Sequence, residues 1–207
     1  MELALKGYKV VGIDLSQKMV DEARSRAARQ GVNVEFHQSS FENLSSVAGE
    51  QFDLVLSNFG GLNCVESLEK VATQVASVTK PGGHFIAVVM PRVSLWEIVA
   101  GISRFNLSFA FRRFTTDTPA TGFHGRTFRV SYYSPRQFTS AFRQSFYVAE
   151  IRGLNIITPP PQATRFKAKN PRLSSLLEQC DEILGSFPIL RSMGDHSLIV
   201  LKKKQST

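Results

Sequence analysis

The sequence predicts an α/β fold built on a doubly wound, mostly parallel sheet. Short apolar runs, of the kind found in buried parallel strands, alternate with helical patterns along the first 90 residues. Glycine- and proline-rich turn signals separate these runs. This alternation is typical of βαβ units, whose crossovers are right-handed.

The elements can be placed in order along the chain. The first apolar run, at residues 9–14, ends in Asp14, and we expect both of its faces to be covered. Ser16 is a good N-cap and Gly31 a good C-cap for the helix that follows. Further strands are expected at residues 32–37, 52–57, 85–90, 147–154 and 196–201, and further helices at 65–79, 95–109, 136–144 and 173–184. We expect a turn at 81–83, a looser segment at 115–129 and an antiparallel strand at the sheet edge near the C-terminus.

The composition is that of one globular domain with a basic surface. The net charge of +8 over 207 residues favours anionic partners such as nucleic acid, membrane surfaces or acidic ligands. The two cysteines lie far apart, which argues against a disulfide framework or a zinc ribbon. No cluster of His, Cys, Asp and Glu has metal-ligand spacing, so we expect no metal. The N-terminus has no signal-peptide pattern, and a cytoplasmic protein is expected.

Asp14 is the first candidate for a binding residue. Ligands of doubly wound sheets bind beyond the carboxyl ends of the strands, and an acid there can accept two hydrogen bonds from a ribose diol. An Asp in this position can equally begin the next helix as a cap. Both interpretations stay open from this residue alone.

Four segments in the same order strengthen the first interpretation. They are GYKVVGIDLSQKM at 7–19, VEFHQSSFENL at 34–44, FDLVLSNF at 52–59 and KPGGHFIAVV at 80–89. In order and spacing this set resembles class I S-adenosylmethionine (SAM) methyltransferases of the methyltransferase type 11 kind. The resemblance implies a Rossmann-like sheet, SAM as cofactor and methyl transfer as the activity.

The resemblance also implies roles for the residues near the adenosine part of SAM. Asp14 would hold the ribose hydroxyls, and Leu15 and Met19 would flank the adenine, unless they only pack the helix. The family usually has Gly-Asp-Ala after its third strand, whereas this chain has Ser40 and Phe41 in the corresponding stretch. Ser40 can hydrogen-bond to adenine but supplies no negative charge. Phe41 is expected either to stack on adenine or to join the core.

At the methionine end, the resemblance assigns Ser57, Asn58 and Phe59 to the cofactor. The family also has an earlier strand that ends in a GxGxG loop, about 20 residues before the acid. Asp14 is only the fourteenth residue, so we expect this first strand and its loop to be missing. Two explanations stay open: the natural protein begins upstream of Met1, or the gene is truncated and its product is unstable, rearranged or inactive.

We expect a single methyltransferase-like domain over residues 1–207. Residues 1–90 would form a partial cofactor-binding half, 91–146 a helical insertion that covers the substrate, and 147–207 the last strands and helix. The insertion mixes Phe with Arg, which is typical of a lid over an apolar substrate or of a peripheral membrane contact, and equally of a small helical subdomain. His124, Tyr132 and Tyr133 are candidate general bases, but the sequence assigns none of them.

The predicted function is transfer of a methyl group from SAM to a small aromatic or lipid-like acceptor. Three other functions each fit part of the pattern. A non-catalytic scaffold or binding module fits the missing loop. A nucleic-acid methyltransferase fits the charge, but base-amino enzymes carry an Asn/Asp-Pro-Pro-aromatic motif where this chain has Asn58-Phe-Gly-Gly, so nucleic acid is not expected as a partner. A nicotinamide-dependent oxidoreductase would also need a glycine loop, and the Lys80-Pro-Gly-Gly turn fits methyltransferases better.

Overall fold

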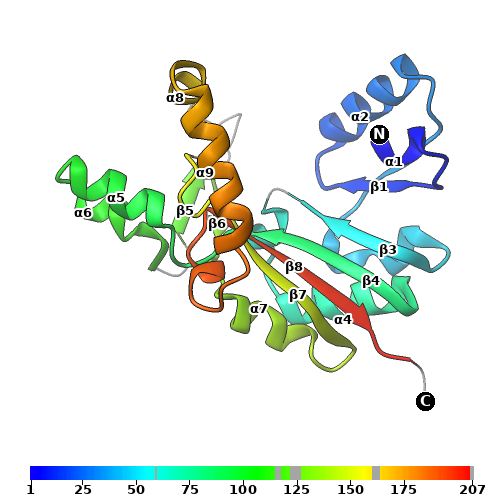
Figure 1. Cartoon of the computed structure of the whole chain (residues 1–207). Helices are drawn as coiled ribbons and strands as arrows, with labels where there is room; N and C mark the ends of the chain where they lie inside the picture. The colour runs from blue at the N-terminus through cyan, green and yellow to red at the C-terminus, as the bar shows by residue number, and fades with distance from the viewer. Residues whose placement is uncertain (59, 115–117, 122–126, 160–163, 206–207) are drawn as a thin grey trace.

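The computed structural model describes the chain except residues 59, 115–117, 122–126, 160–163 and 206–207. Strands and helices alternate through the first half, as the sequence predicts (Figure 1). The strands are β1 (Val11–Asp14), β2 (Glu35–Gln38), β3 (Phe52–Ser57), β4 (Thr79–Val89), β5 (Thr118–Thr121), β6 (Thr127–Val130), β7 (Phe146–Leu154) and β8 (His196–Lys203).

The helices fall into three groups along the chain. The first group is α1 (Glu2–Leu5), α2 (Gln17–Arg29), η1 (Phe41–Asn43), α3 (Ser45–Ala48), η2 (Gly61–Cys64) and α4 (Leu68–Val78). The second is α5 (Leu95–Ser103), α6 (Leu107–Ala110), η3 (Arg112–Phe114) and α7 (Pro135–Phe142). The third is α8 (Thr164–Lys169), α9 (Pro171–Leu184) and η4 (Leu190–Ser192).

The largest sheet has the order β3-β4-β8-β7. β3 and β4 are parallel, and β8 is antiparallel to both of its neighbours, β4 and β7. The expectation of an antiparallel edge strand needs correction, because the antiparallel strand β8 lies inside this sheet and β7 forms the edge. The predicted α/β class is otherwise confirmed, but the sheet is mixed and not mostly parallel, because β8 pairs antiparallel with both of its neighbours.

β1 and β2 form a separate parallel pair. Within the described residues, no pairing joins this pair to β3, and the absence of a first strand stays a prediction. β1 is only half-buried, contrary to the expected coverage of both faces. Leu54 and Leu56 of β3 are exposed as well, since the core of the large sheet lies against its other face.

That core lies between the large sheet and the helices α4 and α7, which run along one face of it (Figure 1). The amphipathic pattern of α4 buries Leu68, Val71 and Val75 against the strands. Aromatic rings complete the core: Phe138 stacks on Phe142 with centroids 4.9 Å apart. α7 begins at Ser134 with a capping box, which fixes the start of this helix.

Two local features differ from expectation. The turn predicted at 81–83 lies within β4 as an irregularity, since β4 pairs with β3 through Thr79 and then resumes at His84. The segment expected to be loose contains an antiparallel hairpin of β5 and β6. In the part of the chain that the structure describes, no helix is long and apolar enough to cross a membrane.

Candidate cofactor and acceptor site

The carboxyl ends of β1, β3 and β4 define the candidate site. β1 ends at Asp14, β3 at Ser57 and β4 at Val89. Doubly wound sheets bind ligands at this edge, where the strand-to-helix loops leave backbone groups and side chains available. The predicted site residues lie at the ends of β1, β2 and β3 or in the segments that follow them.

Asp14 makes the capping contact that the sequence left open, and its ribose contact stays a prediction. Its Oδ1 accepts a hydrogen bond of 2.8 Å from the backbone N–H of Ser16, at the start of α2. Ser16 makes no side-chain cap of its own, so the Asp14 carboxylate caps this helix. The second oxygen, Oδ2, has no hydrogen-bond partner in the described residues, and the side chain is exposed. One carboxylate oxygen is therefore available to a ligand.

Two large apolar side chains close to Asp14 in the chain are exposed to solvent. Leu15 is 72% exposed and Met19 is 55% exposed. The alternative of helix packing is disfavoured for both, because packed side chains would be buried. These exposed apolar side chains and the available carboxylate oxygen fit the adenosine part of SAM. The flat adenine ring would contact the apolar side chains, and the ribose diol would donate hydrogen bonds to the acid.

The segment after β2 is held by local contacts. Ser40 Oγ accepts a hydrogen bond from the backbone N–H of Glu42 and so caps η1. Phe41 packs against the hydrophobic core and lies close to Gly61, where a Cβ would meet its ring at 3.3 Å. These contacts favour the core role of Phe41, and adenine contacts of Ser40 and Phe41 stay predictions.

Ser57 at the end of β3 carries an unsatisfied hydroxyl. The residue is 4% exposed, and its Oγ has no hydrogen-bond partner among the described residues. Buried hydroxyls nearly always have a partner, so this group has capacity for a ligand or a water molecule. Its position fits the expected contact with the cofactor. Asn58 follows it in the chain, and Phe59 lies outside the described residues.

The structure adds Asn63 to the candidate site, and the sequence interpretation missed this residue. This residue is fully buried, and its side-chain amide donates to the carbonyls of Met90 and Ser131 at 3.0 and 2.7 Å. Its Oδ1 accepts from the Met90 N–H at 2.8 Å. Asn63 therefore connects the end of β4 to the segment after β6. The only signal for this role in the sequence was the presence of a polar residue within an apolar stretch.

A second missed group is an ion-pair cluster centred on Arg113. Its guanidinium is 5% exposed and contacts Glu97 Oε1 and Asp195 Oδ1, each at 2.7 Å. Burial alone would raise the pKa of Glu97, but the hydrogen bonds from Arg112 and Arg113 outweigh it and hold that pKa below its usual value. The cluster attaches α5 and η3 to the start of β8, beside the end of β4.

The candidate bases do not gather into an obvious catalytic group. Tyr132 is buried under the Arg113 guanidinium, 5.4 Å from its ring centroid. Tyr133 packs against Phe138 at 6.5 Å between ring centroids. His124 lies outside the described residues. Among the residues that the structure describes, no three metal-ligating side chains come together.

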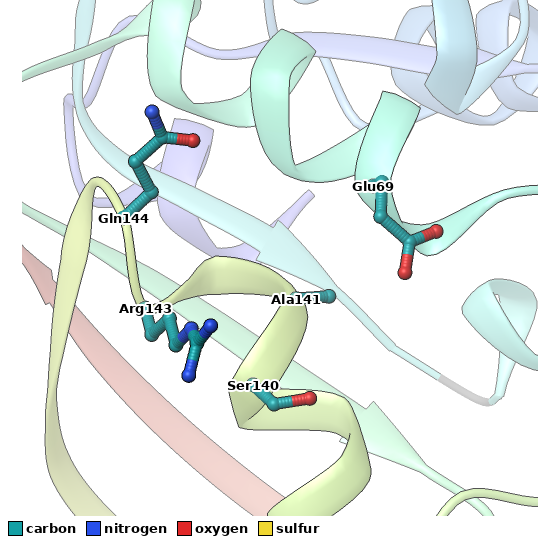
Figure 2. Close-up of a pocket in the computed structure, with 5 residues that line it drawn as sticks. All are labelled: Glu69, Ser140, Ala141, Arg143 and Gln144. Atoms are coloured by element: carbon teal, nitrogen blue, oxygen red, sulfur yellow. The ribbon is translucent and has the colours of Figure 1, made fainter.

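One surface pocket lies away from this site. It has a volume of ≈ 330 Å³ and is lined by Glu69, Ser140, Ala141, Arg143 and Gln144. Figure 2 shows these side chains on α4 and at the end of α7, on the helical side of the sheet. None of the predicted cofactor residues lines it, and it has the character of a groove between two helices.

Comparison with known sequences agrees with the resemblance. Residues 1–83 match the family model described as a methyltransferase domain. The ubiquinone biosynthesis O-methyltransferase of Sinorhizobium fredii is 38% identical over 88 residues, which are 42% of this chain and 35% of that protein. The corresponding protein of Aeromonas salmonicida is 31% identical over 106 residues, covering 47% of this chain and 42% of that protein. The match thus spans less than half the length of these curated relatives.

Solved structures extend the comparison to nearly the whole chain. A SAM-dependent methyltransferase structure from Methanosarcina mazei has a TM-score of 0.63 and 18% identity, over 99% of this chain and 86% of that one. A putative SAM-dependent methyltransferase from Listeria monocytogenes has a TM-score of 0.58 and 18% identity, over 95% and 81%. Residues 1–83 therefore match the methyltransferase domain family, and the chain as a whole has the fold of class I SAM-dependent methyltransferases.

Proposed function

We propose that this chain transfers a methyl group from SAM to a hydroxyl oxygen of a small aromatic or lipid-like acceptor. The observation that carries the proposal is Asp14, which offers one carboxylate oxygen at the end of β1, within the matched residues 1–83. The relatives' name, ubiquinone biosynthesis O-methyltransferase, supports an oxygen atom as the methylated position and a lipid-like acceptor.

The residues of the chain have separable roles in this proposal. SAM, when bound, supplies a methyl group on a positively charged sulfur. Asp14 binds the ribose hydroxyls through Oδ2, with Leu15 and Met19 against the adenine. Ser57, Asn58 and Phe59 hold the methionine end of SAM. Ser40 and Phe41 lie at the edge of the adenine site. The protein then works mainly by aligning the acceptor oxygen with the methyl carbon, because a direct displacement depends on orientation.

The three segments named from the sequence form one domain in this proposal. Residues 1–90 hold the cofactor, residues 91–146 cover the acceptor, and residues 147–207 complete the sheet. The Arg113 cluster supports this division, because it joins the covering segment to the end of the sheet next to the proposed site.

A membrane contact fits a lipid-like acceptor. The segment of α5, α6 and η3 projects from the sheet, away from α4 and α7 (Figure 1). Its exposed apolar residues are Val99, Ile102, Phe105, Leu107, Phe111 and Phe114. Phe105 is 97% exposed and is next to Arg104, also exposed. Exposed aromatic and aliphatic groups beside cationic ones are typical of surfaces that rest on an anionic membrane.

The first test is calorimetric titration of the chain with S-adenosylhomocysteine, the product form of the cofactor. We expect affinity in the micromolar range, reduced about 10- to 100-fold in Asp14→Asn, since a charge-assisted hydrogen bond is lost. The variant keeps a side-chain oxygen to cap α2. Asp53→Asn is the matched control, because Asp53 is an exposed acid at the opposite end of β3. A folded chain that does not bind the ligand would instead favour a non-catalytic binding module.

The membrane contact is tested separately by flotation with vesicles of phosphatidylcholine and phosphatidylglycerol. Phe105→Ser is expected to reduce the bound fraction, while Tyr147→Ser is not. Tyr147 is the control because it is 63% exposed and lies on β7, outside the segment of α5, α6 and η3. Equal flotation of all three proteins would contradict a contact through α5 and α6.

A further inference from the structure

α9 carries a row of apolar side chains that the rest of the described protein leaves uncovered. Leu173, Leu176 and Ile183 are 45%, 55% and 66% exposed, and Cys180 is half-buried between them. The positions 173, 176, 180 and 183 are spaced by three and four residues in turn, which places these side chains on one side of the helix. This strict spacing is typical of a seam between two packed helices, since a helix that covers a core has a wider apolar face.

The row continues past the end of α9. The N–H group of Phe187 donates to the carbonyl of Leu184 at 3.1 Å, so the chain makes one more turn in the helical sense. Phe187, four residues after Ile183, is 53% exposed, and Ile189 is 78% exposed. The α9 stripe thus comprises Leu173, Leu176, Cys180, Ile183, Phe187 and Ile189.

A different side of α9 holds the helix on the protein. Its buried residues are Ser174 and Asp181. The Asp181 carboxylate accepts hydrogen bonds of 2.9 and 3.0 Å from the backbone N–H groups of Ile157 and Thr158, in the segment after β7. α9 contacts mainly β7 and α8, and it projects from the end of the large sheet (Figure 1). The α9 stripe therefore belongs to a helix that is already fixed, and a partner that docks on it has little backbone to order.

The charges of α9 favour a protein partner over a membrane. The helix carries one basic residue, Arg172 in its first turn, and three acidic residues, Glu178, Asp181 and Glu182. Helices that lie on anionic membranes have a basic polar face, which the segment of α5, α6 and η3 offers and α9 does not. The apolar side chains of the α9 stripe therefore fit the surface of another protein.

The α9 stripe is self-complementary, which selects a second copy of this chain as the partner. Cys180 lies in its middle, because Leu173 precedes it by seven residues and Phe187 follows it by seven. Read in reverse, the row keeps its alternation of three and four residues. An antiparallel copy therefore places bulky side chains opposite bulky side chains, with the small cysteines near the crossing point. A two-fold dimer uses the same patch of both subunits in this way.

Neither the flanking charges nor the size of the α9 stripe opposes such a dimer. The residues beside its middle are Gln179 and Ser186 on one side and Leu177 and Leu184 on the other, so no like charges face each other there. The five exposed apolar side chains offer on the order of 500 Å² per copy, as large as the largest apolar patch of an ordinary monomer. Two copies would bury about 1,000 Å², which reaches the lower limit for a specific interface.

We propose that two copies of this chain associate through the α9 stripe, with their α9 helices antiparallel about a two-fold axis near Cys180. Removal of the exposed leucine, isoleucine and phenylalanine side chains from water drives the association. The inference concerns assembly alone, and it is independent of the proposed methyl transfer.

Sedimentation velocity of the purified chain tests the assembly. We expect a species of twice the chain mass of 23.0 kDa at micromolar concentrations. Ile183→Glu places a charge within the α9 stripe and should weaken dimerisation about 30-fold or more, as loss of a central interface side chain does. Ile102→Glu is the matched control, because Ile102 is also an exposed isoleucine on a helix, at 53% on α5. This control should dimerise like the wild-type chain.

Cross-linking with a short bismaleimide locates the interface. We expect Cys180 of one copy to be linked to Cys180 of the other, and peptide mass spectrometry identifies the linked peptides. Cys64→Ser should cross-link like the wild-type chain, whereas Cys180→Ser should not. Cys64 serves as the control because it is a free, exposed cysteine that lies outside α9.

Three outcomes would overturn the inference. A wild-type chain that sediments as a monomer even at high micromolar concentrations has no such interface. A dimer that persists in Ile183→Glu, or that is linked through Cys64, uses another face. A monomeric chain whose flotation with anionic vesicles falls in Ile183→Glu assigns the α9 stripe to a membrane. Circular dichroism of each variant establishes that the fold is retained, and none of these results depends on binding of S-adenosylhomocysteine.

Discussion

Arg113 and Asp195 are 82 residues apart in the chain, yet their side chains meet at 2.7 Å in a buried site. The same guanidinium donates to the Asp195 carbonyl at 2.9 Å and to Glu97 Oε1 at 2.7 Å. One buried cation therefore joins α5, η3 and the beginning of β8. This contact fixes the segment of α5 and η3 beside the end of β4, where the acceptor is proposed to bind.

The Arg113 contact predicts a large loss of stability on substitution. Arg113→Met leaves Glu97 and Asp195 buried without their shared cation, and the free energy of unfolding should fall by about 3–5 kcal/mol. Urea denaturation, monitored by circular dichroism, measures this loss of stability. Arg152→Met is the control, because Arg152 pairs with Glu150 at the surface and such pairs contribute about 0–1 kcal/mol. Equal effects of the two substitutions would contradict the assigned importance of the cluster.

The same cluster predicts a dependence of stability on pH. The pKa values of Glu97 and Asp195 are lowered in the folded chain, despite burial, by Arg112 and Arg113 for Glu97 and by His196 and Arg113 for Asp195. A lowered folded-state pKa contributes stability above the unfolded-state pKa, about 4 for carboxyl groups, and this contribution is lost as pH falls through the folded-state value.

Urea titrations from neutral pH down to about pH 3, below the unfolded-state pKa values, measure this effect. The wild-type chain should lose more stability over that range than the double variant Glu97→Gln/Asp195→Asn, which lacks both carboxylates. Parallel curves for the two proteins would show that other acids dominate the acid transition.

Asn63 is expected to be sensitive to loss of its amide. Asn63→Leu leaves the N–H and carbonyl of Met90 and the carbonyl of Ser131 without these partners, and each buried unpaired group costs about 1–3 kcal/mol. Thermal unfolding should therefore begin at a distinctly lower temperature. The exposed Asn33 provides the control substitution Asn33→Leu. An unchanged melting curve for Asn63→Leu would show that water replaces the amide without loss.

Gly101 is required where α5 and α6 approach each other. A Cβ at this position would lie 2.6 Å from the backbone nitrogen and the Cβ of Ala110. Gly101→Ala should cost about 1–3 kcal/mol and, by displacing α6, reduce flotation with anionic vesicles. Ser103→Ala at the exposed end of α5 is the matched control. Full stability and unchanged flotation of Gly101→Ala would show that the two helices separate freely.

The sequence predicted local structure well where the signal lay within one element. The apolar run ending in Asp14 and the caps around the next helix gave β1 and α2 close to their observed bounds. The Ser134-Pro135 start of α7 was equally readable, because capping depends on neighbouring residues. The place of β8 inside the sheet was not readable, since strand order depends on pairing between distant segments.

The candidate site likewise has a part that could be predicted from the sequence and a part that depends on contacts between distant segments. The sequence by itself predicted the cofactor edge, because the acid after the strand at 9–14 and the serine at the end of the strand at 52–57 follow from position along the chain. Only the tertiary structure decided which side chains complete it. Asn63 contacts Ser131, and Arg113 contacts Asp195, across long stretches of chain. Such contacts depend on how the elements pack, which local patterns of residues do not encode.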